Sequence, residues 1–308
     1  MFTKMSKKVL GIALTSVLVA GVMAGCGTKN EDNKSGASSS PTTSTAPSTS
    51  ASTSPSKSPE ITGTVTASGS TALQPLVQQA ATDFMAKNPK VTVQVTGGGS
   101  GTGVKNVADG VSTIGNSDVE ADAALKDKLK DNIVAVAPFA LIVNKDVTID
   151  NLTLQQAADI YSGKITNWKD VGGPDKKIVL VHRQDGSGSK KLVSQIVMKG
   201  ADFSKENGVT QDSSKTVAEA VSTTSSAIGY VDTPYITDAV KALKIDNVAF
   251  SKDSIQQGKY PLFGVEHMYT GKTPDAATQA FIDFIMSKDF QDTTVEKLKF
   301  LPASVAKK

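Results

Sequence analysis

Short strands alternate with amphipathic helices along residues 61–304. Residues 62–67 and 91–95 place apolar side chains at alternate positions, a pattern that predicts strands with one buried face. Residues 73–84 and 276–286 place apolar side chains three and four positions apart, which predicts helices with one apolar face. Because the alternation continues through the whole segment, the predicted fold class is α/β.

The same patterns predict the remaining elements. The apolar runs on either side of Pro138 predict two separate buried strands. A helix over 153–161 is expected to begin at Thr153 or Asn151 as N-cap. Trp168, the only tryptophan, is expected to anchor the core or a hinge rather than to stack on a ligand. The other predicted strands are 111–117, 133–137, 139–143, 227–231 and 263–269, and the other predicted helices are 121–130, 190–198 and 216–221.

The N-terminus has the pattern of a secretory leader. Lysines are followed by the apolar run 9–22, which is too short to span a membrane comfortably. Residues 23–26 resemble the lipobox of bacterial lipoproteins, although Met23 stands where leucine is usual. The resemblance implies a signal peptide over 1–25, cleavage before Cys26 and acylation of its sulfur. The alternative is an ordinary signal peptide with an incidental cysteine.

Residues 26–60 are expected to form a disordered tether. Between Ser35 and Pro59 the chain is mostly Ser, Thr and Pro and has no large apolar residue to bury. A flexible chain of this length reaches on the order of 30 Å. Cys26 is the only cysteine, so the exported domain is expected to fold without disulfides and to have no metal cluster.

The charge of the chain excludes some partners. The net charge of +3 falls to zero once the three lysines of the leader are removed. A neutral exported domain has no basic field for nucleic acid or for an anionic membrane surface. Any anion is therefore expected to be bound by local contacts.

Three loops rich in glycine and hydroxyl side chains each follow a strand and precede a helix. They are 68–71, 97–104 and 186–189. Val104 stands where a P-loop needs lysine, and Thr102 stands where a dinucleotide fingerprint needs glycine, so neither nucleotide motif is present. The first amides of a helix are unpaired and favour anions, so these loops predict an anion site at the carboxyl ends of the strands.

Arg183 and Asp118 are the charged candidates for that site. Arg183 is the only arginine and directly precedes the third loop, and its planar guanidinium suits a bidentate oxyanion. The alternative is a flexible turn with a surface arginine. Asp118 ends the strand 111–117, and as an isolated residue it could simply cap the next helix.

Several of these segments together resemble the phosphate-binding lipoproteins of bacterial phosphate-specific ABC transport systems. The resemblance is carried by Ser68-Gly69-Ser70-Thr71, by 98–103, by 114–118 and by 183–189, and it is supported by 154–168, 227–230 and 281–284. It implies a two-lobe, type II periplasmic-binding-protein-like fold with two crossover strands as the hinge. The implied lobes are 61–140 plus 261–308, and 141–260.

The resemblance also implies the site and the partners. It implies no enzyme activity and no cofactor, but high-affinity binding of inorganic phosphate by a lipid-anchored monomer on the outer face of the cell membrane, with delivery to an ABC permease. Asp185 would orient Arg183 without touching the ligand. The implied phosphate contacts are Ser70, Thr71, Ala72, Ser100, Asp118, Arg183, Ser187, Gly188 and Ser189.

The chemistry of Asp118 agrees with phosphate. An ionised carboxylate only accepts hydrogen bonds, so it can take the proton that phosphate keeps at neutral pH, whereas sulfate has no proton to give. Other hypotheses are a sulfate or molybdate binder, a phosphatase or hydrolase, and a surface adhesion module. His182, Asp185 and Ser187 supply the residue types of a catalytic triad, but they are crowded into six positions without a nucleophile elbow.

Overall fold

The computed structural model describes residues 60–206 and 208–307. The predicted leader, Cys26 and the tether up to residue 59 lie outside the described residues. None of the described helices combines the length and the apolar character needed to cross a lipid bilayer.

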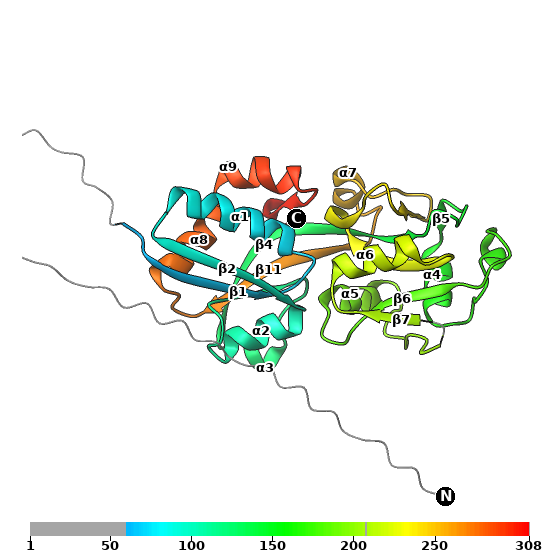
Figure 1. Cartoon of the computed structure of the whole chain (residues 1–308), viewed down its shortest axis with the longest axis horizontal. Helices are drawn as coiled ribbons and strands as arrows, with labels where there is room; N and C mark the ends of the chain where they lie inside the picture. The colour runs from blue at the N-terminus through cyan, green and yellow to red at the C-terminus, as the bar shows by residue number, and fades with distance from the viewer. Residues whose placement is uncertain (1–59, 207, 308) are drawn as a thin grey trace, which may run out of the picture. The chain divides into compact units, whose positions relative to one another are not determined.

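The described elements form two α/β lobes joined by two long strands, β4 (Leu129–Val143) and β11 (Phe263–Gly271) (Figure 1). In the first lobe the strand order is β2-β1-β3-β11-β4. β1 (Gly63–Gly69) runs parallel to β2 (Val91–Gly98) and β3 (Ile114–Ser117), and β11 is antiparallel to β3 and β4. The α/β class and the two-lobe arrangement predicted from the sequence are thus confirmed.

Helices cover both faces of the first lobe's sheet. α1 (Gln74–Lys87) and α8 (Ala276–Met286) pack on one face, where the rings of Phe84 and Phe281 meet with centroids 5.3 Å apart. α2 (Ser100–Ala108) packs on the other face, in a smaller apolar cluster. This sandwich buries the alternating apolar residues of the strands and fixes the ends of β1, β2 and β3 relative to each other.

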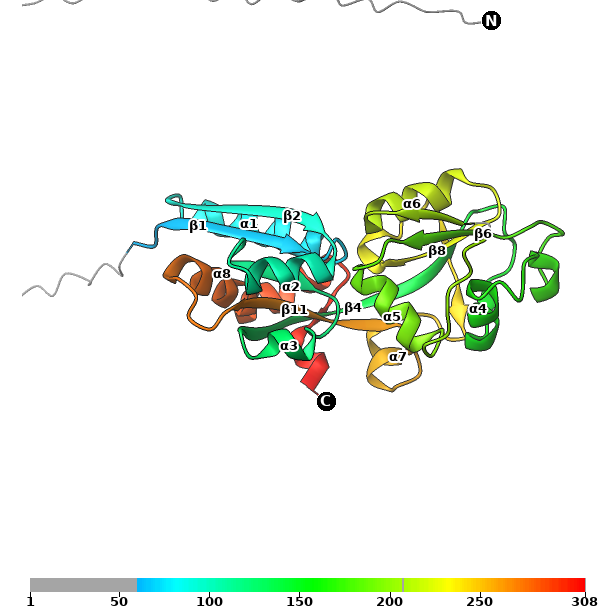
Figure 2. The same ribbon diagram turned by 90° about the horizontal axis from the view of Figure 1, so that it is seen from below.

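The second lobe has the strand order β4-β8-β6-β7. Apolar side chains on one face of this sheet pack with α6, and those on the other face pack with α4 and α5. Figure 2 shows these helices at the opposite end of the described region from α1, α2 and α8, with β4 and β11 running from one group to the other. The bounds are β6 (Val179–Arg183), β7 (Gly208–Gln211), β8 (Ala227–Asp232), α4 (Leu154–Tyr161), α5 (Gly188–Ile196), α6 (Ser214–Thr223) and α7 (Lys252–Gln256).

The remaining elements are short. The two-residue strands β9 and β12 pair with β4, and β5 pairs with β10 outside the main sheet. Their bounds, with those of the short helical segments, are α3 (Ala123–Lys126), β5 (Asn151–Leu152), η1 (Trp168–Val171), η2 (Thr233–Tyr235), β9 (Lys241–Ala242), β10 (Lys244–Ile245), α9 (Lys288–Phe290), η3 (Gln291–Val295), β12 (Leu301–Pro302) and η4 (Ala303–Lys307).

Two sequence predictions about this region are wrong. Residues 133–137 and 139–143 are parts of one strand, β4, and Pro138 lies inside it. Up to Pro138 the strand pairs with β11, and from Phe139 onward it pairs with β8, so proline stands where the ladder changes partner. The predicted helix 121–130 shrinks to α3, because β4 already begins at Leu129.

Two other local predictions are confirmed. Thr153 caps α4 in a reciprocal capping box with Gln156. Trp168 is completely buried, and its indole N–H donates to the carbonyl of Ser226 over 2.9 Å. The sole tryptophan therefore anchors the core of the second lobe.

Candidate functional site

Loops from both lobes meet beside the crossover strands. The first lobe contributes the segments that follow β1, β2 and β3, and the second lobe contributes the segment between β6 and α5. Each lies at the carboxyl end of a strand, the usual ligand-binding edge of an α/β sheet. The residues expected there are all buried: Ser70, Thr71, Ala72, Ser100, Asp118, Arg183, Ser187, Gly188 and Ser189.

Asp118 accepts hydrogen bonds from both lobes. The hydroxyl of Ser70, in its own lobe, donates to Oδ1. The hydroxyl of Ser189, in the other lobe, donates to Oδ2 over 3.2 Å. The backbone N–H of Asp118 donates to Oγ of Ser100 over 3.1 Å. Its carboxylate therefore lies at the junction of the lobes and does not cap α3, whose N-cap position is Asp122.

Arg183 ends β6 and spans the same junction. Its Nη1 donates to Oγ of Ser214 over 3.1 Å, and its Nη2 donates to Oγ1 of Thr71 in the first lobe over 3.1 Å. Nη2 also donates to the carbonyl of Asp212 over 3.1 Å. The residue is 1 % exposed, and its Nε has no hydrogen-bond partner among the described residues. The alternative of a surface arginine in a flexible turn is wrong.

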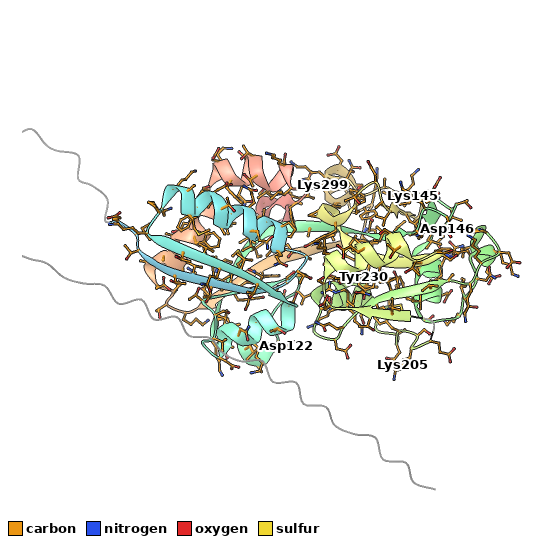
Figure 3. All side chains as sticks on the ribbon, viewed as in Figure 1. Asp122, Lys145, Asp146, Lys205, Tyr230 and Lys299 are labelled. Carbon is orange, nitrogen blue, oxygen red and sulfur yellow. The ribbon has the colours of Figure 1, made fainter. Side chains whose placement is uncertain are left out.

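Tyrosines hold the backbone around these groups. The backbone N–H of Arg183 donates to the hydroxyl of Tyr230 over 3.1 Å, and Tyr230 is labelled in Figure 3 within the second lobe. The hydroxyl of Tyr235 donates to the carbonyl of Thr71 over 2.5 Å, from one lobe to the other. Burial raises the pKa of Tyr230 above its usual value, so this phenol stays protonated at neutral pH.

Helix N-termini point their first amides at the same region. Ser70 accepts hydrogen bonds from the amides of Ala72 and Leu73, both over 3.1 Å, just before α1. Ser187 is the N-cap of α5 and accepts from the amide of Lys190 over 3.3 Å. Together with the start of α2 at Ser100, these ends supply partial positive charge without adding a formal charge.

Two glycines allow the close approach that builds the site. A Cβ on Gly188 would lie 2.6 Å from Oδ2 of Asp118 and would also clash with Oγ of Ser100. A Cβ on Gly103 would lie 2.6 Å from Cα of Gly69, so glycine lets α2 sit directly on β1. Side chains at these positions would separate the loops that carry the polar groups.

The lobes also touch at the rim of the site. The amide of Gly101 donates to the carbonyl of Gly186 over 3.0 Å. Lys191 of α5 pairs with Asp122 of the first lobe over 3.3 Å, and Asp122 is labelled in Figure 3. Two pockets open between the lobes here, with volumes of about 190 and 680 Å³, and α5 lines both.

Asp185 does not have the role that the resemblance implied. Its side chain is 98 % exposed and pairs with Lys190 over 2.7 Å. Arg183 is instead oriented by Thr71, Ser214 and the carbonyl of Asp212. The expected link between Asp185 and Arg183 is therefore wrong: Asp185 follows the strand end and points to solvent.

The triad residue types are not assembled. His182 is buried against the rings of Tyr161 and Phe203, and neither of its ring nitrogens has a hydrogen-bond partner among the described residues. Ser187 caps α5, and Asp185 faces solvent. No hydrogen bond of the described region joins these residues, so the geometry needed to activate a serine is missing.

Sequence reasoning missed four groups of the site, of which Ser214, Asp232 and Glu266 are buried and Tyr235 is half-buried. Ser214 accepts a hydrogen bond from Arg183, and Tyr235 donates one to the carbonyl of Thr71. Asp232 ends β8 and is 1 % exposed, and Glu266 lies within β11 and is 0 % exposed. Asp232 follows an apolar strand, as Asp118 does, and this pattern could have identified it. Glu266 gave no signal, because only the pairing of β11 places it there.

The electrostatics of the site depend on burial. Burial raises the pKa of Asp118, while hydrogen bonds from Ser70 and Ser189 and the charge of Arg183 oppose the rise. Burial also raises the pKa values of Asp232 and Glu266 well above their usual range, and the neighbouring carboxyl groups raise them further. One guanidinium thus lies among three buried carboxyl groups.

Comparisons with known proteins agree on one family. A family model described as a PBP superfamily domain matches residues 43–289. The chain is 35 % identical over 305 residues to the phosphate-binding protein PstS of Bacillus subtilis, covering 98 % of this chain and 95 % of that protein. It is 29 % identical over 279 residues to the phosphate-binding protein PstS of Pseudomonas aeruginosa, covering 80 % of this chain and 86 % of that protein.

Solved structures show the same relationship. A protein from Clostridium perfringens, described as a phosphate ABC transporter substrate-binding protein with bound phosphate, superposes with a TM-score of 0.73 at 34 % identity, covering 78 % of this chain and 99 % of that one. An ABC-type phosphate transport receptor from Vibrio cholerae gives a TM-score of 0.64 at 25 % identity, covering 77 % of this chain and 99 % of that one. The chain belongs to the PBP superfamily and, within it, to the PstS family of phosphate-binding proteins.

Proposed function

We propose that this chain binds inorganic phosphate in the cleft between its lobes and delivers it to an ABC permease. The proposal follows from membership of a family of substrate-binding proteins, which are not enzymes. The observation that carries it is the pair Asp118 and Arg183, which lie in different lobes and share a ring of hydroxyl groups. Such a ring suits a tetrahedral oxyanion that needs both donors and one acceptor.

Each polar group has a distinct task in this proposal. The guanidinium of Arg183 compensates the charge of the anion and donates to two of its oxygens. The hydroxyls and the helix-terminal amides donate to the remaining oxygens, and each contributes about 1 kcal/mol or more. Asp118 accepts the proton that phosphate keeps and sulfate lacks. The proposed contacts are Ser70, Thr71, the amide of Ala72, Ser100, Asp118, Arg183, Ser187, the amide of Gly188, and Ser189.

Closure of the lobes is part of the proposal. We assign residues 61–140 and 261–308 to the first lobe and 141–260 to the second, with β4 and β11 as the hinge. The contacts between Gly101 and Gly186 and between Lys191 and Asp122 support a closed arrangement. A ligand held between lobes is released when the hinge opens, and the permease is proposed to promote that opening.

The site of action is proposed from the N-terminal sequence. Cleavage after residue 25 and acylation of Cys26 would anchor a monomer on the outer face of the cell membrane. The tether 26–60 would then let the binding domain reach the permease. Metabolic labelling with a palmitate analogue, compared between the wild type and Cys26→Ala, tests the anchor, which is excluded if both forms are labelled equally.

Titration calorimetry tests the binding function. Phosphate is titrated into the purified protein with and without excess sulfate. Tight binding that excess sulfate does not weaken supports the proposal, whereas a loss of phosphate affinity in excess sulfate favours a general oxyanion binder. Absence of any heat or thermal stabilisation with phosphate would refute the proposal.

A further inference from the structure

Glu266 is a buried carboxyl group without a visible counter-charge. It lies on the crossover strand β11, opposite Ala135 of β4, and it is 0 % exposed. Neither of its oxygens accepts a hydrogen bond from any described residue, and it belongs to none of the ion pairs of the described region. A buried ionised carboxylate without a partner is strongly disfavoured, so this environment favours a protonated group.

Glu266 adjoins Asp118. A Cβ on Gly264 would lie 3.2 Å from the backbone oxygen of Asp118 and 3.4 Å from Oε1 of Glu266, so the two residues meet over this glycine. Burial raises the pKa of Glu266, and the neighbouring carboxyl group of Asp118 raises it further. Two ionised carboxylates cannot bond, because both only accept, but a protonated carboxyl can donate to an ionised one.

Asp232 completes the group. It is 1 % exposed, and neither of its oxygens has a hydrogen-bond partner among the described residues. Burial raises the pKa of Asp232, and the charge of Asp118 raises it further. The charged and titratable groups that act on Glu266 and Asp232 lie on three neighbouring segments of the fold. They are Asp118 after β3, Arg183 on β6 and Tyr235 in η2.

The charges decide the protonation. With all three carboxyl groups ionised, these groups and Arg183 would together carry a net charge of −2 before any anion entered, and phosphate would be repelled. With Glu266 and Asp232 neutral and Asp118 ionised, the net charge of the four groups is zero. Only the second state combines an acceptor for the phosphate proton with no net repulsion of the anion.

We propose that Glu266 and Asp232 remain protonated when the site binds phosphate, and that Glu266 donates its proton in a hydrogen bond to the Asp118 carboxylate. Glu266 is then a positioning residue. Its hydrogen bond keeps the Asp118 carboxylate ionised and correctly oriented, so that Asp118 can accept a hydrogen bond from the ligand. This inference rests on the proposed phosphate binding. It adds a residue of the strand β11 to the groups that distinguish phosphate from sulfate, and it predicts that this discrimination is sensitive to alkaline pH.

The pKa values support this assignment. Burial and the neighbouring carboxyl groups raise the pKa values of Glu266 and Asp232 well above the usual range. For a carboxyl group whose folded pKa is raised, the associated stability is complete below the unfolded pKa, near 4, and is lost as pH rises toward the folded pKa. Phosphate affinity should likewise fall when alkaline pH removes these protons.

The test compares two replacements of Glu266. Glu266→Gln keeps a neutral donor, and Glu266→Met removes it with little change in length. Phosphate and sulfate affinities are measured by calorimetry at pH 7 and pH 9, with the exposed Glu219→Gln as the matched control. We expect Glu266→Gln to bind phosphate within about threefold of the wild type at pH 7, and Glu266→Met to lower the phosphate-to-sulfate ratio by about tenfold or more.

Three outcomes would overturn the inference. A gain of tenfold or more in anion affinity for Glu266→Gln would show that the wild-type group is ionised. An equal loss in Glu266→Gln and Glu266→Met would show that the residue is merely structural. An unchanged phosphate-to-sulfate ratio in Glu266→Met would show that no donor is needed.

Infrared spectroscopy keeps the inference testable if either variant fails to fold. The wild-type protein should show the C=O stretching band of a buried protonated carboxyl at pH 7 and lose it at alkaline pH. Asp232→Asn should remove part of that band, while Asp238→Asn, an exposed control in the same lobe, should not. Absence of the band would refute the inference even if phosphate binds, and failure of the wild type to bind phosphate would instead refute the proposed function.

Discussion

The hydroxyl of Ser189 donates a hydrogen bond to Oδ2 of Asp118 over 3.2 Å, although the two residues are 71 positions apart and belong to different lobes. Ser189 lies in the first turn of α5, and Asp118 follows β3. The bond therefore links the two lobes at the candidate site. Changes to either residue should alter ligand binding and lobe closure together.

Asp118→Asn should weaken the discrimination between phosphate and sulfate. The amide can donate to a sulfate oxygen, which the carboxylate repels, and it loses half of the acceptor capacity used for the phosphate proton. We expect the phosphate-to-sulfate affinity ratio to fall by about tenfold or more, equivalent to about 1.4 kcal/mol. Parallel titrations with both anions measure it, and an undiminished ratio would contradict the acceptor role.

Arg183→Lys should weaken phosphate binding while preserving the charge. The guanidinium uses Nη1 and Nη2 to reach Ser214, Thr71 and the carbonyl of Asp212, and an ammonium cannot reproduce this fork. We expect a loss of about 1–3 kcal/mol in binding free energy. Calorimetry at constant ionic strength measures it, with Lys190→Arg, at a half-buried lysine in the first turn of α5, as a matched conservative exchange. Equal affinity of wild type and Arg183→Lys would place Arg183 outside the site.

Gly188→Ala should hinder closure without unfolding either lobe. The added Cβ would lie 2.6 Å from Oδ2 of Asp118 across the cleft, so the loops must separate to accommodate it. We expect the free energy of phosphate binding to become less favourable by about 1–3 kcal/mol. Gly271→Ala is the control, because no atom lies within 4 Å of its added Cβ.

The thermal unfolding of the Gly188→Ala variant separates closure from folding. Its melting temperature without phosphate should stay near that of the wild type, since the clash is relieved by opening the cleft. A large drop in melting temperature without ligand would mean that Gly188 matters for folding instead.

His182→Leu should make the protein less sensitive to acid. Burial lowers the pKa of His182 from 6.5 to about 4, so this residue is neutral in the folded protein at pH 7. Because its folded pKa is depressed, unfolding takes up a proton between these values, and stability is lost as pH falls from about 6.5 toward 4. Removing the ring should abolish roughly 2 kcal/mol of this loss.

Chemical denaturation at pH 7.5 and pH 5 measures the effect of His182→Leu. The leucine side chain still packs on Tyr161 and Phe203, so any loss of packing should be the same at both pH values. The difference in unfolding free energy between variant and wild type should therefore move in favour of the variant at pH 5. A constant difference would show that His182 does not titrate on unfolding.

Local patterns in the chain were enough to predict much of the architecture. Apolar spacing predicted α8 with its observed bounds, and residue type narrowed the N-cap of α4 to Thr153 or Asn151, because both depend on neighbours within a few positions. The predicted break at Pro138 was wrong, since a missing N–H interrupts a strand only where a partner needs it. At Pro138 the ladder passes from β11 to β8.

The sequence by itself determined which residues carry the chemistry of binding: one arginine, one acid at a strand end, and loops of small hydroxyl residues before helices. Only the tertiary structure decided how they meet. It turned Asp185 to solvent, joined Arg183 to Ser214, and placed Asp232 and Glu266 beside Asp118. The physical reason is that hydrogen bonding and desolvation depend on distances across the cleft, which strand pairing and lobe packing set and which spacing along the chain does not encode.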